Sequence, residues 1–148
     1  MTKQQKKPQL EFIPLATDTQ PTIPMAEIPV HAGFPCPVDD AYMSQPIDLN
    51  KELIKHPASS YLVRVAGDSM IDEGIDEGDL LVVDRSLLPS EKNITVVMYA
   101  GEFALKRIVQ KEDKIYLMPG NEKYAPIVVG DSSELRIFGV VTWVMKKK

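Results

Sequence analysis

The sequence predicts a mostly β protein, in which a compact, antiparallel, barrel-like β-domain follows a flexible, proline-rich N-terminal arm. Nine of the 12 prolines lie within the first 57 residues, where they remove backbone donors and disfavour helix in the residue before them. From Tyr61 onward, short runs rich in Val, Ile, Leu and Tyr alternate with turn-forming residues, which is typical of antiparallel strands. A chain of 148 residues has the length of one domain. We expect the arm over residues 1–46 and the β-domain over residues 47–148.

The arm shows no helical or strand period that persists between Pro8 and Pro46. We therefore expect an extended or irregular segment with little packing. Such a segment is either a plain linker, which its composition favours, or a stretch of chain open to a protease. After the arm, Asp48 is a candidate N-cap and apolar residues follow at positions 49, 53 and 54. This pattern predicts a short amphipathic helix that is ended by Pro57.

Six strands are expected in the β-domain, separated by turns such as Pro119-Gly120-Asn121. Their β-branched, aliphatic and aromatic content is typical of half-buried strands. The expected strands span residues 61–65, 79–84, 94–100, 102–109, 114–118 and 135–145.

Charge and cysteine content exclude several classes of function. Lys and Arg number 17 against 21 Asp and Glu, a net charge of −4, so no basic field favours direct, sequence-specific DNA binding. The single cysteine, Cys36, has no partner for a disulfide or a metal site, which favours a reducing compartment and hence the cytoplasm. The basic N-terminus has no apolar stretch behind it, and the apolar run 137–145 is too short to span a bilayer. We expect no export signal, no membrane partner and no cofactor.

Ser69 is the first candidate catalytic residue. It follows a valine-rich strand and is preceded by Gly67, with Gly74 and Gly78 behind it. Glycines let the backbone turn sharply, which would expose the hydroxyl and free the backbone N–H groups of Asp68 and Ser69 to hold an oxyanion. The alternative is an ordinary turn serine, because Gly, Asp and Ser are common in turns.

Lys106 is the second candidate, 37 positions later in the run 101–108. Strand alternation places it on the same face as Ala104 and Ile108. A lysine there lies either at a sheet edge, where lysines block aggregation, or in an apolar pocket. In a pocket, desolvation would favour the neutral amine, which could act as a general base for Ser69.

Other constellations are weaker. A Ser-His-Asp triad would need His31 or His56, and neither lies near a predicted strand that would fix it. The acidic residues of 68–79 fail the spacing of an EF-hand loop, so a solvated turn is expected and no metal site. Lys146-Lys147-Lys148 is expected to be a solubilising tail, with a weak anion-binding patch as the alternative.

At these residues the sequence resembles a known family. The run 59–84, the run 101–108 and Phe138-Gly139-Val140-Val141 closely resemble the LexA/UmuD family of self-cleaving SOS-response proteins, over about residues 31–145. The repressors of that family carry a DNA-binding domain ahead of this module, where this sequence has the proline-rich arm. The resemblance implies that Ser69 is the nucleophile and Lys106 the general base.

The resemblance also implies the substrate and the partners. The family cuts its own arm, usually between a small residue and glycine, and Ala32-Gly33 fills that place here. The implied trigger is a RecA filament on single-stranded DNA. The implied product is a homodimer that serves an error-prone Y-family polymerase in translesion synthesis. Two alternatives remain: a signal-peptidase-like Ser-Lys protease that acts on other proteins, and a non-catalytic β-domain that only binds partners.

Overall fold

The computed structural model describes residues 10–13, 22–23 and 46–148. The chain divides into two units, residues 16–55 and a larger unit made of residues 1–15 and 56–148. In the smaller unit, β2 (Thr22–Ile23) pairs antiparallel with β3 (Ile47–Asp48), which leads into α1 (Leu49–Leu53). The Asp48 side chain accepts a hydrogen bond from the Asn50 N–H at 2.9 Å, so Asp48 caps the helix as its sequence position predicts.

The described residues of the larger unit form a single sheet of eight strands, all antiparallel. Its strands are β1 (Leu10–Ile13), β4 (Ser60–Val65), β5 (Leu80–Asp84), β6 (Thr95–Tyr99), β7 (Glu102–Lys111), β8 (Lys114–Met118), β9 (Ile127–Val128) and β10 (Leu135–Met145). Three short 3₁₀ helices connect them: η2 (Pro57–Ser59), η3 (Ile71–Glu73) and η4 (Ser132–Glu134).

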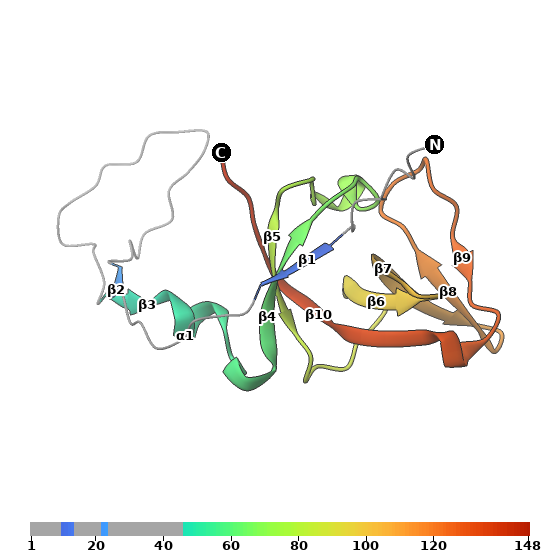
Figure 1. Cartoon of the computed structure of the whole chain (residues 1–148), viewed down its shortest axis with the longest axis horizontal. Helices are drawn as coiled ribbons and strands as arrows, with labels where there is room; N and C mark the ends of the chain where they lie inside the picture. Colours follow the sequence, from blue (N-terminus) through green and yellow to red (C-terminus); the bar gives the residue numbers. More distant parts are fainter. Residues whose placement is uncertain (1–9, 14–21, 24–45) are drawn as a thin grey trace, which may run out of the picture. The chain divides into compact units, whose positions relative to one another are not determined.

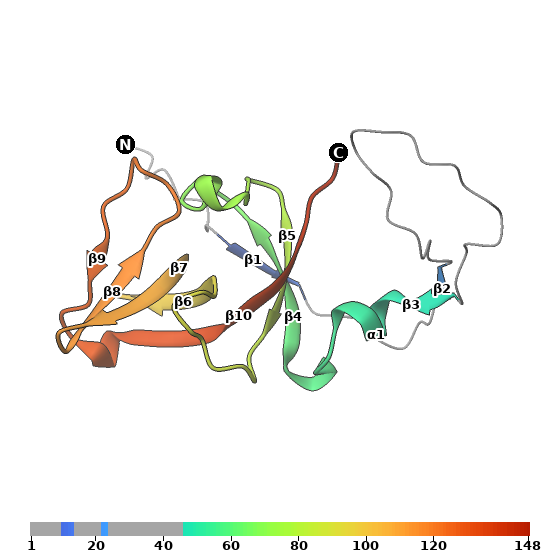
Figure 2. The same ribbon diagram turned by 180° about the vertical axis from the view of Figure 1, so that it is seen from behind.

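The long strand β10 joins the two halves of this sheet. The strand order is β1-β4-β5-β10-β6-β7-β8-β9, so β10 pairs with β5 through its C-terminal half and with β6 through its N-terminal half. Figure 1 shows β10 running across the unit between these two groups of strands. Figure 2 shows β6 to β9 from behind. The mostly β, antiparallel prediction is confirmed, but the sheet does not close into a barrel, because β1 and β9 remain its unpaired outer edges.

A backbone irregularity in β10 lets one strand serve both halves. The register against β6 shifts between Ile137 and Gly139, and the register against β5 shifts after Val141. Gly139 has φ +149°, and a Cβ there would lie 2.7 Å from Val83 Cγ1 and 2.9 Å from the Asp84 carbonyl oxygen. Glycine is therefore required at this point of close approach.

The core lies between the two groups of strands. The buried residues of the main cluster are Leu10, Val63, Val65, Met70, Ile75, Leu81, Val83, Val96 and Leu105. They come from β1, β4, β5, β6, β7 and the loop after β4. The loop that contains Ser69 is consequently fixed to the core by its own apolar neighbours.

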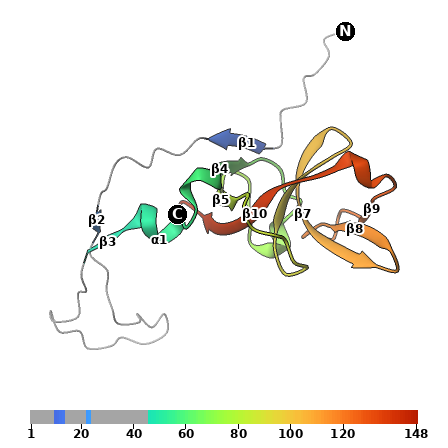
Figure 3. The ribbon, with the colours of Figure 1, turned by 90° about the horizontal axis from the view of Figure 1, so that it is seen from below.

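The predicted strands match the structure closely, with β8 and β10 at the predicted bounds. The arm, expected to be extended or irregular with little packing, contains two short strands, β1 and β2, and Leu10 of β1 belongs to the core cluster. Figure 3 shows β1 alongside β4. Its four residues are flanked by proline and carry too short a pattern to detect, and they form a strand because β4 offers an edge.

Candidate active site

Ser69 lies in a tight turn between β4 and η3. Gly67 has φ +95°, a left-handed conformation that side chains rarely adopt, and it reverses the chain immediately after β4. The Asp68 carbonyl then accepts from the Ile71 N–H at 3.2 Å, and the Met70 side chain is buried. The sequence therefore predicts the turn correctly.

The loop between β8 and β9 holds this turn from the other side. The Gly120 N–H donates to the Ser69 carbonyl at 2.8 Å, and the Asp72 N–H donates to the Gly120 carbonyl at 2.6 Å. The Asn121 amide nitrogen donates to the Asp68 carbonyl at 2.7 Å. Three hydrogen bonds to backbone atoms around Ser69 thus fix where its hydroxyl lies.

Gly120 is needed for this contact. A Cβ at position 120 would lie 2.5 Å from Glu73 Cγ and 3.2 Å from Met70 Cα. Sequence reasoning recognised residues 119–121 only as a turn, because their role depends on a contact 50 positions away. The proline-glycine-asparagine triplet was the available signal, but it did not show what the turn supports.

Tyr124 extends the same loop over the pocket. Its hydroxyl donates to Asp68 Oδ1 at 2.6 Å, and the hydrogen bond and the charge of Asp68 raise the pKa of Tyr124. Its ring centroid lies 6.0 Å from Lys106 Nζ, at the outer limit of a cation–π contact. Sequence analysis did not identify this residue.

Lys106 is buried in the middle of the sheet. It lies on β7, opposite Thr95 of β6, and β8 pairs with the following residues of β7. Only 7% of its surface is exposed. The sheet-edge alternative is therefore wrong, and the apolar-pocket alternative describes its position.

Burial also changes the acid–base behaviour of Lys106. Removal of the amine from water disfavours its charged form and so lowers the pKa of Lys106. In the described part of the chain no carboxylate forms an ion pair with it. A charged partner would favour the protonated amine, whereas this environment favours the neutral amine.

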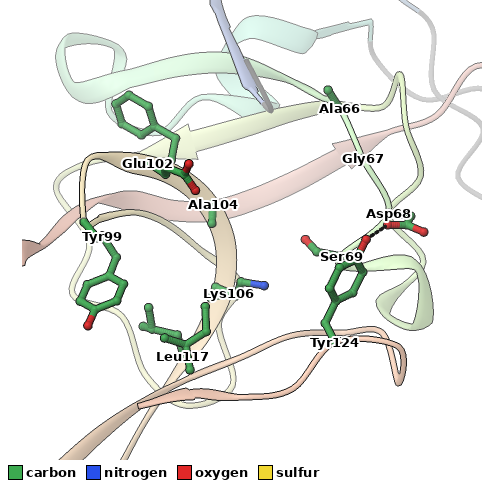
Figure 4. Close-up of a pocket in the computed structure, with 13 residues that line it drawn as sticks. Ala66, Gly67, Asp68, Ser69, Tyr99, Glu102, Ala104, Lys106, Leu117 and Tyr124 are labelled. Carbon is green, nitrogen blue, oxygen red and sulfur yellow. Dashed lines mark hydrogen bonds between the residues drawn. The ribbon is translucent and has the colours of Figure 1, made fainter. Parts of the chain in front are cut away.

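Ser69 and Lys106 line the same pocket, which has a volume of about 280 Å³. Its wall near the two residues is made of small groups, Ala66, Gly67 and Ala104. Figure 4 shows the Ser69 hydroxyl and the Lys106 amine pointing into the same space, with Tyr124 bound to Asp68 at its rim. The two side chains are not hydrogen-bonded to each other in this structure.

The predicted oxyanion donors are backbone N–H groups of the Ser69 turn. The N–H groups of Asp68 and Ser69 donate to no acceptor among the described residues. Ala32 and Gly33, the predicted scissile bond, lie outside the described residues. Their position relative to Ser69 stays a prediction.

His56 does not join this pocket but has a fixed partner of its own. Its Nδ1 lies 2.5 Å from Asp84 Oδ2, at the end of β5, although its side chain is 52% exposed. The expectation that His56 lies near no strand that would fix it is therefore wrong. Burial of Asp84 would raise its pKa, but hydrogen bonds from Ser86, His56 and Ser59 outweigh burial and lower the pKa to about 2.

Lys146 forms ion pairs with two carboxylates of the acidic turn. Lys146 Nζ lies 2.5 Å from Asp76 Oδ2 and 2.6 Å from Asp79 Oδ2. Lys146 is thus part of the folded unit, which corrects the expectation of a solvated tail at this residue. No helix in residues 46–148 or the two shorter described segments is long and apolar enough to cross a membrane.

Comparison with known proteins shows that the chain is similar to members of a peptidase family. Residues 24–142 match the family model described as Peptidase S24-like. The chain is 40% identical to protein SamA of Salmonella typhimurium over 86% of this chain and 88% of SamA. It is 39% identical to protein MucA of Escherichia coli over 76% of this chain and 77% of MucA. LexA repressor 2 of Pseudomonas syringae pv. tomato is 39% identical over 60% of this chain and 44% of the repressor. The family match includes both Ser69 and Lys106.

Proposed function

This chain belongs to the peptidase S24-like family, and from that premise we propose that it is a Ser-Lys peptidase that cuts its own arm between Ala32 and Gly33. The observation that carries the proposal is the burial of Lys106 in the pocket that Ser69 also lines, with no acidic partner among the described residues. A neutral amine beside a serine hydroxyl is the arrangement that Ser-Lys chemistry needs.

In the proposed reaction, neutral Lys106 accepts the proton of the Ser69 hydroxyl as its oxygen attacks the carbonyl carbon of Ala32. The Ala32-Gly33 bond then breaks, and Lys106 returns the proton to the Gly33 amine as it leaves. Water next attacks the ester on Ser69, with Lys106 again accepting a proton and Ser69 recovering its hydrogen. The products are a fragment ending at Ala32 and a chain beginning at Gly33.

The oxyanion of each step would be held by the backbone N–H groups of Asp68 and Ser69. Their lack of a protein acceptor among the described residues supports this role. The hydrogen bonds from Gly120 and Asn121 to the same turn would keep these donors oriented. Donors that are already oriented stabilise the transition state most, because the surrounding structure does not have to reorganise during the reaction.

The chain's own arm is a suitable substrate on steric and entropic grounds. Alanine and glycine let the backbone approach a pocket walled by Ala66, Gly67 and Ala104. A tethered substrate also avoids the entropy cost of a bimolecular encounter. Because an intact protein must survive until it is needed, the cleavable pose has to be sparsely populated until a trigger favours it.

We propose the trigger and the later partners from the resemblance to the LexA/UmuD family, which the similarity to MucA and LexA repressor 2 supports. A RecA filament on single-stranded DNA would favour the cleavable pose without supplying catalytic groups. The product, a cytoplasmic homodimer, would serve an error-prone Y-family polymerase in translesion synthesis. These roles place the chain in the SOS response to DNA damage.

Incubation of the purified chain at about pH 10, where even an ordinary lysine is substantially deprotonated, tests the dyad without the trigger. The unchanged chain should cut itself, whereas Ser69→Ala and Lys106→Ala should stay intact and folded. Lys111→Ala, an exposed lysine on the same strand, is the matched control and should cut at the unchanged rate. Cutting that survives Ser69→Ala would eliminate the dyad. A chain that never cuts would favour a partner-binding β-domain.

A further inference from the structure

We propose that the outer edge of β4, together with the rings of Tyr61, Phe103 and Phe138, is a docking groove for an extended peptide with apolar side chains at alternate positions. In the uncut chain, residues 10–13 of the arm occupy it as β1. The groove does not depend on the proposed cleavage. One consequence, the release of residues 10–13 from the groove, rests on that cleavage.

The backbone of β4 shows which groups the groove offers. The Val65 N–H donates to the Asp79 carbonyl at 2.9 Å, and the Val65 carbonyl accepts from the Gly78 N–H at 2.8 Å, so Val65 is turned toward the β5 side. In an antiparallel strand successive residues turn their backbone groups to opposite neighbours. Leu62 and Arg64 therefore turn theirs toward β1, and both are paired in register with it.

Two side chains of β1 provide the apolar contacts. Leu10 and Phe12 lie opposite Val65 and Val63 in the register, which places them on the face of the sheet that holds the core. Leu10 is only 7% exposed and belongs to the core cluster. The alternation of leucine and phenylalanine at positions i and i+2 thus matches the groove.

The Phe12 ring lies in an aromatic cluster. Its centroid is 4.8 Å from that of Phe103 and 5.5 Å from that of Tyr61, and Phe103 packs edge-to-face against Phe138 at 4.8 Å. An apolar pocket of about 390 Å³ remains beside Phe12 and Ile13. Phe12 is 38% exposed, and the rest of its surface is covered. Its removal would expose the rings of Tyr61 and Phe103 that it now contacts, next to the strand edge of β4 that β1 had paired.

The position of the occupant in the chain makes it removable. Residues 10–13 precede the proposed scissile bond, so the cut would place them on the leaving fragment. Before the cut the tether gives them an effective concentration of about 1 mM, whereas afterwards they bind only at the concentration of free fragment. A strand of only four residues, such as β1, binds weakly to a neighbouring strand when it is not tethered. We infer that the cut product exposes the β4 edge to extended partner segments, which recognise such edges by strand addition.

Hydrogen exchange of single β4 amides tests the groove without any cleavage. In the full-length Ser69→Ala chain, Phe12→Asp should displace β1 and accelerate exchange of the Leu62 and Arg64 amides about tenfold or more. The amides of Tyr61, Val63 and Val65, which turn toward β5, are the internal reference and should not change. Phe12→Tyr keeps the ring and should behave like the parent chain. Uniform acceleration of all five amides, or none, would overturn the inference.

Displacement in trans gives a second readout. A synthetic peptide spanning residues 8–15, added to the Phe12→Asp chain, should restore protection of Leu62 and Arg64. A peptide with serine at positions 10 and 12 should not. Failure of the first peptide at millimolar concentration would overturn the groove. Protection that instead rises with protein concentration alone would assign the groove to a second copy of the chain.

Release is tested on the cut protein. After alkaline cleavage and dilution to about 1 μM, far below the effective concentration of the tether, the Leu62 and Arg64 amides should exchange as fast as in the Phe12→Asp chain. A cut protein in which both stay protected would contradict release while leaving the peptidase proposal intact. A chain that does not cut would contradict the peptidase proposal, and the two preceding experiments would still decide the groove.

Discussion

At the scale of single residues, the acid–base behaviour of Lys106 follows from where β7 places it. The residue lies inside the sheet, opposite Thr95, with 7% of its surface exposed. Desolvation disfavours the ammonium form, and no carboxylate among the described residues offsets this by ion pairing. The proposed role as a base therefore depends on burial.

The pH dependence of self-cleavage tests this point. Because burial lowers the pKa of Lys106, the fraction of neutral amine should rise, and the cleavage rate with it, at pH values below the ordinary lysine pKa of 10.5. The rate should then level off. Single-turnover rates measured across pH 6 to 11 by gel densitometry would show the midpoint. A midpoint at or above 10.5 would mean that Lys106 is solvated and is not a preformed base.

Asp84 makes a different contribution, to stability. Its hydrogen bonds with Ser86, His56 and Ser59 lower its pKa to about 2, below the ordinary value of 3.8. A carboxyl with a lowered folded-state pKa stabilises the protein above its unfolded-state pKa and loses that effect as pH falls. The free energy of unfolding should thus decrease between about pH 4 and pH 2.

Asp84→Asn should remove part of that pH dependence and lower the free energy of unfolding at pH 7 by about 1–2 kcal/mol, because four donor groups on three residues lose a charged acceptor. Urea denaturation at several pH values is the measurement. Asp113→Asn, in an exposed turn, is the control and should retain the full dependence. An Asp84→Asn profile that falls as steeply as the parent's would contradict this account.

At the scale of elements, the β8–β9 loop is what makes the Ser69 turn rigid. Asn121 is 7% exposed and donates to the Asp68 carbonyl, and Gly120 is bonded to the turn on both of its backbone groups. Neither residue touches the reacting atoms in the proposed mechanism. Both position the turn that contains the nucleophile.

Asn121→Ala should therefore slow self-cleavage about tenfold, because small displacements of a nucleophile are costly, while the protein remains folded. Asn93→Ala is the matched control, since within the described part of the chain the Asn93 side chain accepts hydrogen bonds only from Ser90, away from the pocket. It should cut at the parent rate even if both variants lose similar stability. Equal rates for the two variants, measured at one pH, would show that Asn121 has no positioning role.

The irregularity in β10 gives a prediction about the sheet. Gly139→Ala should lower the free energy of unfolding by about 2–4 kcal/mol, since the new Cβ collides with Val83 and the Asp84 backbone at a left-handed φ. Gly130→Ala meets no atom within 4 Å and should change stability little. Denaturant titrations of both variants are the check. A small change in the free energy of unfolding for Gly139→Ala would mean that β10 can relax and that its shift in register is not required.

At the scale of the whole molecule, the sequence predicted what depends on local pattern. Strands β8 and β10 lie at their predicted bounds because their apolar runs are clearly bounded, β8 by turn residues on both sides and β10 by Lys146 at its end. The turn at Ser69 was found from its glycines. In each case the information lies within a few consecutive residues.

What the sequence could not predict depends on contacts between distant segments. The edge or interior position of Lys106 follows from the order of strands, which alternation does not determine. The support from Gly120 and Asn121 crosses some 50 positions. Strand β1 exists because β4 offers an edge. The open sheet, where a barrel was expected, likewise reflects long-range pairing.

The most direct measurement of the central claim is the intact mass of the fragments formed by the purified chain at about pH 10, a pH that deprotonates lysine. Two fragments should form, one ending at Ala32 and one beginning at Gly33, whose masses sum to the chain plus one water. Both should be absent from Ser69→Ala and Lys106→Ala. The same fragments from either variant, or an intact parent chain throughout, would contradict that claim.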